Sequence, residues 1–260
     1  MGDTCVYPVI QADKLVITGG DFSQTINYIH GQAERNFEAE TRKLHRFVSY
    51  DAFHDSYKHA SPQYHILTPA EEDIINTATN WASNGDLDRC DRVLHLDLST
   101  CTSGQYVAQH IAELFEHQNS LRGTFFFRFP EHTRHYEQLF VTTLAYQLGV
   151  NLPDTNAAIL GAIRSDPYIL TRNTKKQMQR LVLDPLRQIS SRKTPNIFII
   201  TTFPEVPGLN SHSSITQAIH AAAEGEDYGC VRFLILRHGL DNCAYLRSLD
   251  SLLLWDVRLN

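Results

Sequence analysis

The residues with the clearest potential for chemistry lie between Arg92 and Glu113. An apolar stretch is followed by a short polar loop with one glycine, Gly104, and then by an amphipathic segment. This order predicts a strand, a loop and a helix. Backbone N–H groups at a helix start placed in this way can hold the phosphate groups of a nucleotide. The pattern therefore predicts a phosphate-binding loop.

The loop nevertheless lacks the side chains that nucleotide hydrolysis requires. A working phosphate loop places a lysine beside the phosphates and a Ser or Thr hydroxyl on Mg²⁺. Here those two places hold Gly104 and Gln105. A nucleotide could still rest weakly on the N–H groups near Ser103 through the helix dipole. Efficient hydrolysis is not expected, because Mg²⁺, which neutralises most of the charge on the transferred phosphoryl group, has no protein ligand in this loop.

Composition narrows the class of protein. The chain has 260 residues, 42% of them hydrophobic, and can bury a sizeable core. Its net charge of −6 and pI near 6.1 argue against a nucleic-acid or anionic-membrane partner. No run approaches the roughly 20 apolar residues of a membrane span, and the start lacks the pattern of a secretory signal. We therefore expect a cytoplasmic protein.

The cysteines and histidines do not predict a metal site. The five cysteines form an odd set without C-x-x-C spacing, which is typical of reduced structural thiols. The 13 histidines form no H-E-x-x-H motif. The nearest group, formed by Asp88, Cys90, Asp91 and His95, has no second cluster to complete a tetrahedral site. No metal ligand and no catalytic nucleophile is expected.

Two regions differ in pattern. Residues 1–60 lack a strand–helix rhythm and form a separate N-terminal segment, with a short strand over 14–20, a helix over 33–48 and a connector over 52–62. Residues 22–30 alternate apolar and polar side chains, so they either pair with a second copy of themselves or form a strand or tail without a special role. Residues 61–260 form the second domain.

From about residue 67, apolar strands alternate with amphipathic helices. Thr68 followed by Pro69 and by Glu71 is a helix-start pattern. Pro185 should kink the helix in which it lies. Short continuous apolar strands between such helices predict an α/β three-layer sandwich with a mostly parallel central sheet, in which ligands bind at the carboxyl ends of the strands. The expected helices are 68–81, 104–115, 136–149, 153–163, 174–190 and 213–224, and the expected strands are 93–98, 123–129, 196–203, 231–236 and 252–255.

Several short motifs occur in a characteristic order along roughly four-fifths of the chain. They are Ala52-Phe-His-Asp-Ser56, Gly123-Thr-Phe-Phe-Phe127, Thr143-Leu-Ala-Tyr-Gln-Leu148, Ser165-Asp-Pro167 with the stretch 177–186, and Val231-Arg-Phe-Leu-Ile-Leu-Arg237. In this order they resemble the NACHT-type P-loop domain of fungal NOD-like proteins, close to its nephrocystin-type version. The resemblance implies a P-loop NTPase fold and a STAND-like switch that binds ATP or ADP and drives assembly of a signalling complex.

The chain differs from that family at the positions of the family's nucleotide-binding and catalytic residues. Alignment of the helix after the loop places Gly104 at the family's lysine and Gln105 at its Mg²⁺ hydroxyl. In the family's acidic strand-end pattern, Thr201 replaces the first aspartate and only Glu205 remains. His238 replaces an arginine that follows the next strand. The candidate nucleotide-binding residues are therefore Thr102, Ser103, Gly104, Gln105, Thr201, Glu205 and His238.

The sequence favours a pseudoenzyme, that is, an interaction or regulatory module with little or no ATP hydrolysis. No cofactor is expected beyond weak binding of ATP or ADP. The expected partners are proteins, either full-length NACHT relatives or a second copy of the chain. A weakly active ATP- or GTP-binding switch, with Ser103 or Thr102 on Mg²⁺, is the alternative. A truncated product without a selected role is a third reading.

Overall fold

In the computed structural model, the residues described are 37–57, 65–84, 92–127, 136–189, 194–202, 211–225 and 231–238. Contacts divide the chain into two units, Met1–Ala39 and Glu40–Asn260. The division predicted from the sequence lies near residue 60, whereas the contacts group residues 40–57 with the sheet domain. The second unit carries the candidate site and is the one described below. The predicted strands at 14–20 and 252–255 and the segment 22–30 lie outside the described residues.

Four parallel strands form the central sheet of this unit, in the order β1-β4-β3-β2. Their bounds are Val93–Asp97 for β1, Leu121–Phe126 for β2, Asn196–Thr202 for β3 and Val231–Arg237 for β4. β4 pairs with both β1 and β3, so the ends of these three strands share one edge of the sheet. The described strands are all parallel, which agrees with the predicted sheet.

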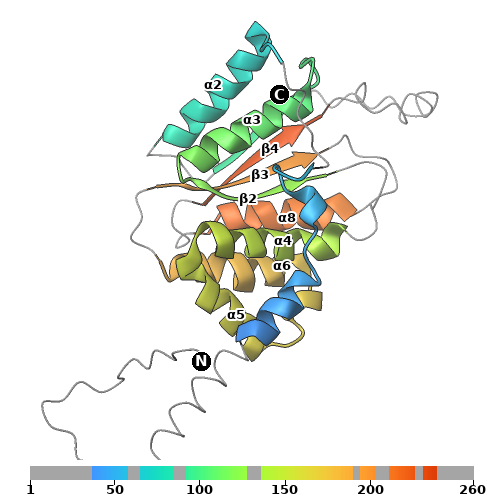
Figure 1. The fold of residues 1–260 in the computed structure, drawn as a ribbon, viewed down its shortest axis with the longest axis vertical. Helices are drawn as coiled ribbons and strands as arrows, with labels where there is room; N and C mark the ends of the chain where they lie inside the picture. The colour runs from blue at the N-terminus through green and yellow to red at the C-terminus, as the bar shows by residue number, and fades with distance from the viewer. Residues whose placement is uncertain are drawn as a thin grey trace, which may run out of the picture. The chain divides into compact units, whose positions relative to one another are not determined.

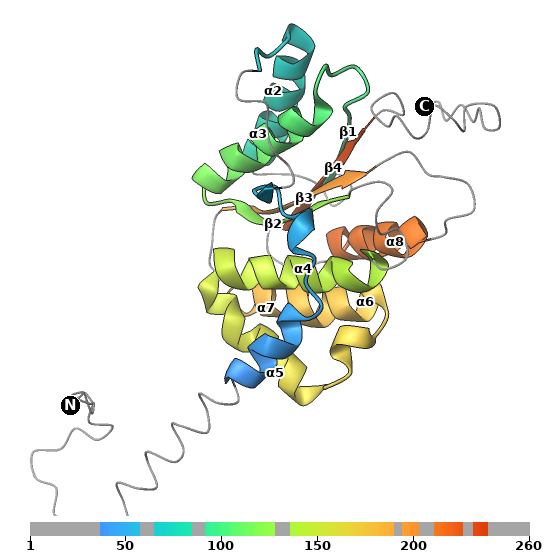
Figure 2. The same ribbon diagram turned by 45° about the vertical axis from the view of Figure 1, so that its right-hand side comes forward.

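Helices cover both faces of the sheet (Figures 1 and 2). α2 (Pro69–Ser83) and α3 (Gly104–His117) lie on one face. On the other side are α4 (Tyr136–Asn151), α5 (Asn156–Ser165), α6 (Thr174–Gln177), α7 (Asp184–Arg187) and α8 (Ser211–Ala223). The predicted α/β three-layer sandwich is confirmed. In the part of the chain that the structure describes, no helix is both long and apolar enough to cross a membrane.

Alternation along the strands explains why both faces are apolar. In β3, Ile197 and Ile199 pack with α2 and α3, while Phe198 and Ile200 pack with the helices on the other side. All four are buried, as expected for a parallel strand covered on both faces. β1 differs, because it lies at the end of the described sheet and its apolar side chains are only partly buried.

Two of the predicted helices form with local differences. In α3, Val107, Ile111 and Phe115 are buried on the sheet, which agrees with the amphipathic segment predicted after Gly104. The helix predicted over 174–190 is built from α6, a π-helical segment at Met178–Leu183 and α7. Proline has no N–H and its ring clashes with the carbonyl four residues earlier, so the wider π turn before Pro185 accommodates it.

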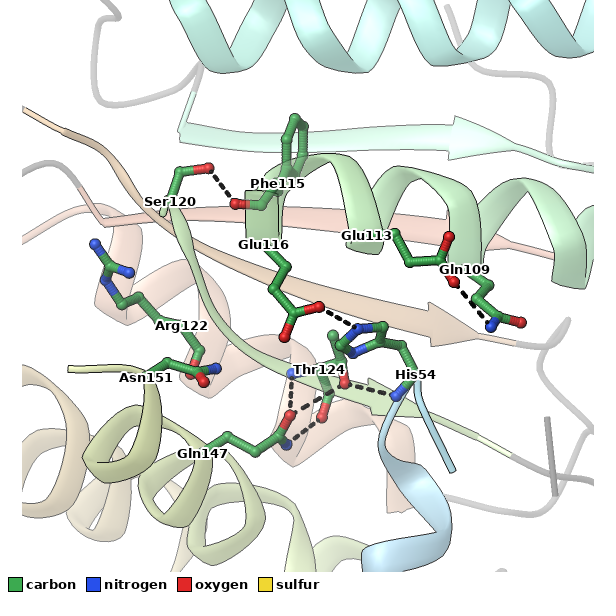
Figure 3. A network of polar contacts seen from close by, with 10 residues as sticks. All are labelled: His54, Gln109, Glu113, Phe115, Glu116, Ser120, Arg122, Thr124, Gln147 and Asn151. Carbon is green, nitrogen blue, oxygen red and sulfur yellow. Dashed lines mark hydrogen bonds and ion pairs between the residues drawn. The ribbon is translucent and has the colours of Figure 1, made fainter. Parts of the chain in front are cut away.

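The segment before α2 covers the β2 edge of the sheet. Leu44, Val48 and Ala52, the last residue of the 3-10 turn Tyr50–Ala52, pack into the core beside α4. His54 donates its backbone N–H to Thr124 Oγ1 of β2 at 3.0 Å. Figure 3 shows that Thr124 also bonds with Gln147 of α4, so helix, strand and segment share one buried polar network.

Candidate phosphate-loop site

Thr102, Ser103 and Gly104 follow the carboxyl end of β1, from which the chain crosses the whole sheet to β2 at the opposite edge. The connection after β1 leads to α3 on one face, whereas those after β2 and β3 lead to helices on the other. Ligand crevices of open parallel sheets form at such a switch point. The loop 98–103 and the end of β4 meet here, since Leu98 donates its N–H to the Arg237 carbonyl at 2.7 Å.

The phosphate-loop position is the start of α3. Ser103 is the N-cap residue, and its side chain makes no capping hydrogen bond. Its backbone N–H is one of those that a phosphate would use. In this structure that N–H donates to Glu71 Oε1 at 3.2 Å. A carboxylate from α2 therefore binds where the predicted loop would bind a nucleotide.

Glu71 is completely buried and hydrogen-bonded on both oxygens. Oε2 accepts from the Thr68 N–H at 2.9 Å and lies 3.0 Å from His65 Nε2. The Thr68 hydroxyl in turn accepts from the Glu71 N–H, which completes a capping box at the start of α2. Burial alone would raise the pKa of Glu71, but the hydrogen bonds from Thr68, His65 and Ser103 outweigh it and lower the pKa to about 2. The side chain therefore carries a full negative charge at neutral pH.

Gly104 is closely packed rather than open to a ligand. A Cβ at this position would lie 3.0 Å from His238 Nδ1 and 3.1 Å from Leu98 Cβ. His238 is buried, and burial lowers its pKa to about 4, so the ring is neutral at physiological pH. The position aligned with the family's lysine is thus filled by a neutral imidazole from the end of β4.

An ion pair spans the ends of the two neighbouring strands. Arg237 Nη2 lies 2.9 Å from Asp97 Oδ2, and the Ser99 N–H donates to Asp97 Oδ1 at 2.8 Å. Burial raises the pKa of Asp97, but the bonds from Arg237 and Ser99 outweigh this effect and lower the pKa. The arginine beside the predicted phosphate site therefore has an internal carboxylate as its partner.

The other predicted residues are dispersed or used internally. Thr201 is buried and its Oγ1 accepts the Phe127 N–H at 3.0 Å, so it holds the end of β2 against β3. Thr102 and Gln105 are exposed at the loop and in the first turn of α3. Glu205 lies outside the described residues. The structure brings Ser103, Gly104 and His238 together and gives Thr201 a separate role.

α2 is held at its other end as well. Arg232 of β4 is buried and donates to the carbonyls of Trp81 and Ala82 at 2.8 and 2.7 Å, and also to that of Asn84. Its guanidinium lies 5.8 Å from the centre of the Trp81 ring. These carbonyls belong to the last turn of α2, where a cation is stabilising. Buried charged side chains therefore hold both ends of the helix that carries Glu71.

Nucleophilic and metal chemistry find little support among the described residues. Burial, with Glu71 and Asp97 nearby, raises the pKa of Cys101 to about 11, which keeps it a thiol. No group of three or more His, Cys, Asp or Glu residues there could hold a metal ion. His95 lies on β1 with its ring 6.1 Å from that of His220, while Asp88, Cys90 and Asp91 lie outside the described residues.

Sequence reasoning missed the two acidic residues that shape the site. Glu71 was assigned only to the start of α2, and Asp97 was not singled out. Both carried a signal, because each is an acidic residue next to an element end that faces the predicted loop. No protein-family model, curated protein or solved structure matches this chain. The resemblance to NACHT domains therefore stays a prediction.

Proposed function

We propose that this chain is a pseudo-NTPase, a P-loop-like domain of NACHT type that acts through protein partners rather than by hydrolysing a nucleotide. The observation that carries the proposal is the hydrogen bond from the Ser103 N–H to Glu71 Oε1. The protein's own carboxylate takes the place of a phosphate oxygen at the start of α3.

Electrostatics makes this carboxylate a strong competitor. A phosphate oxygen near the Ser103 N–H would lie about 4 Å from Glu71, where two unit negative charges repel by about 4 kcal/mol at an effective dielectric constant of 20. That energy corresponds to roughly a thousandfold loss in affinity. Neither Gly104 nor the neutral His238 ring supplies a compensating positive charge. The charge of Arg237 is already balanced by its ion pair with Asp97.

The proposed role is regulatory and cytoplasmic. Partners are full-length NACHT proteins or a second copy of the chain, which the domain would modulate by occupying their assembly surfaces. No nucleic acid and no membrane is proposed as a partner, since the net charge is −6. If no NACHT protein co-purifies with the tagged chain from its own cells, a NACHT relative is not the partner.

Calorimetric titration with ATP and ADP, with and without Mg²⁺, tests whether Glu71 keeps nucleotides from the start of α3. We expect no binding heat up to millimolar nucleotide for the full chain. Glu71→Gln, which removes the charge but keeps the side-chain shape, should bind nucleotide more tightly than the native chain. Micromolar, Mg²⁺-dependent binding to the native chain would refute the proposal. Phosphate release that disappears on Ser103→Ala would favour the weakly active switch.

A further inference from the structure

β2 is the last strand at one end of the sheet in the part of the chain that the structure describes, and it pairs there with β3 alone. The second edge of such a strand carries backbone N–H and C=O groups that can pair with another chain. The sequence of β2 favours such pairing, because Leu121–Phe126 contains one charged residue, Arg122, and no proline. The hydrogen-bond partners of these backbone groups therefore decide whether β2 is open to another strand.

A glutamine side chain from α4 binds both backbone groups of Thr124 in β2 (Figure 3). The Thr124 N–H donates to Gln147 Oε1 at 3.0 Å, and Gln147 Nε2 donates to the Thr124 carbonyl at 2.7 Å. A residue of a neighbouring antiparallel strand would make the same two bonds with Thr124. The side-chain amide can replace that residue because it has an acceptor and a donor side by side, as the backbone does.

The next turn of α4 extends this cover along the strand. Asn151 Nδ2 donates to the Arg122 carbonyl in a long hydrogen bond of 3.5 Å. Arg122 lies two residues before Thr124, and alternate residues of a strand turn their backbone groups toward the same edge. α4 lies directly against β2 here, since a Cβ at Gly123 would be only 3.4 Å from Gln147 Cβ. Two side chains of one helix therefore bind the outer edge of β2.

Further hydrogen bonds hold the Gln147 amide in this orientation. Its Nε2 also donates to the Thr143 carbonyl at 3.3 Å, and the Thr124 hydroxyl donates to its Oε1 at 3.2 Å. The same hydroxyl accepts the His54 N–H at 3.0 Å. Gln147 and Thr124 are both buried. Loss of the amide would therefore leave a buried N–H and a buried carbonyl of Thr124 without these partners, which is costly unless another chain supplies new ones.

From these contacts we infer that Gln147 takes the place of a neighbouring strand, and that it thereby keeps β2 of one copy of the chain from pairing with β2 of a second copy. In an antiparallel pair of two β2 strands centred on Thr124, each Thr124 would donate its N–H to the carbonyl of the other. Those are the two groups that Gln147 binds. The inference goes beyond the proposed function, because it depends neither on Glu71 nor on the identity of a partner protein.

Sedimentation velocity of the full chain tests the inference with Gln147→Met, which keeps the unbranched shape of the side chain and removes both bonding groups. We expect this variant to self-associate at protein concentrations about tenfold lower than the native chain, because the Thr124 groups regain partners only in a pair. Gln147→Leu is a second variant that should behave in the same way. The matched control is Gln177→Met, since Gln177 is buried in α6 and its Oε1 has no hydrogen-bond partner among the described residues. Its self-association should stay within about twofold of that of the native chain.

Thr124→Val separates strand pairing from a general loss of stability. Valine removes the hydroxyl and its bonds with His54 and Gln147, but it keeps the backbone N–H and carbonyl that the amide binds. We expect Thr124→Val to be less stable than the native chain in urea unfolding and to sediment as the native chain does. Circular dichroism verifies that each variant is folded.

Amide hydrogen exchange shows whether β2 is the strand that pairs. The Thr124 N–H should be protected in the native chain, should exchange at least about tenfold faster in dilute Gln147→Met, and should be protected again where that variant associates. Three outcomes would overturn the inference. Folded Gln147→Met and Gln147→Leu associate no more than the native chain, or Thr124→Val or Gln177→Met associates as strongly as they do, or the Thr124 N–H is unprotected in the native chain or in the associated variant.

Discussion

Replacement of Glu71 by glutamine tests the central contact of the site. In the native structure the carboxylate accepts hydrogen bonds from the N–H groups of Ser103 and Thr68 and from the His65 ring. Glutamine has nearly the same shape but only one oxygen. If that oxygen faces Ser103, the amide NH₂ meets the Thr68 N–H, and in the reverse orientation it meets the Ser103 N–H. Either way a buried N–H loses its acceptor.

The expected cost follows from these bonds. An unsatisfied buried N–H costs about 1–3 kcal/mol, and a bond to a neutral oxygen contributes about 1 kcal/mol less than one to a carboxylate. Together they predict a loss of about 3 kcal/mol in the free energy of unfolding. For a domain of this size the loss corresponds to a fall in Tm of about 6–12 °C.

Urea unfolding followed by circular dichroism measures this loss. Glu72→Gln is the matched control, because Glu72 lies next in the same helical turn and is exposed, so its loss should cost only a few tenths of a kcal/mol. If the unfolding free energy of Glu71→Gln lies within about 1 kcal/mol of that of the native chain, the carboxylate does not hold α2 against α3. The proposal that Glu71 blocks nucleotide binding at Ser103 then fails.

Four further predictions concern the start of α3 and the ends of the strands. The pKa of Glu71 is about 2 in the folded chain against 4.5 for the free group. The stabilisation by its charge is therefore complete above pH 4.5 and is lost as the pH falls toward 2. The difference in unfolding free energy between the native and Glu71→Gln chains should shrink over that range. Gly104→Lys should not restore nucleotide binding in calorimetry and should cost about 1–3 kcal/mol, because its Cβ meets His238 and Leu98. Combining Gly104→Ala with His238→Ala should cost less than the sum of the two single changes, as a double-mutant cycle of urea unfolding would show. Thr201→Val should cost about 1–3 kcal/mol, since the Phe127 N–H loses its acceptor; a cost near zero would mean that water replaces the hydroxyl.

Much of the fold could be predicted because it depends on local pattern. The apolar strands β3 and β4 and the buried stripe of α3 follow from periodicity, and the capping box at Thr68 follows from the residues within one turn. These signals come from neighbours in the sequence. For Pro185 the sequence predicted a kink, whereas the structure has a π-helical segment before it, which local pattern did not indicate.

The site was harder to predict because its contacts are long-range. Glu71 and Ser103 are 32 residues apart and meet only when α2 packs beside α3. Thr201 matched the place of an aspartate in the sequence, yet its hydroxyl holds Phe127 of a neighbouring strand. Sequence order predicted the strand, loop and helix around Ser103, but the partner of each polar atom depends on which elements lie side by side.

The double attachment of α2 has a consequence for how the protein opens. Arg232 holds the last turn of the helix to β4, and Glu71 holds the first turn to α3. Such a helix should not fray from one end, and its amide protons should exchange with solvent as one cooperative unit, together with the Ser103 N–H. The loop then becomes accessible only when the whole of α2 detaches, and a partner that binds α2 away from the loop would change this access.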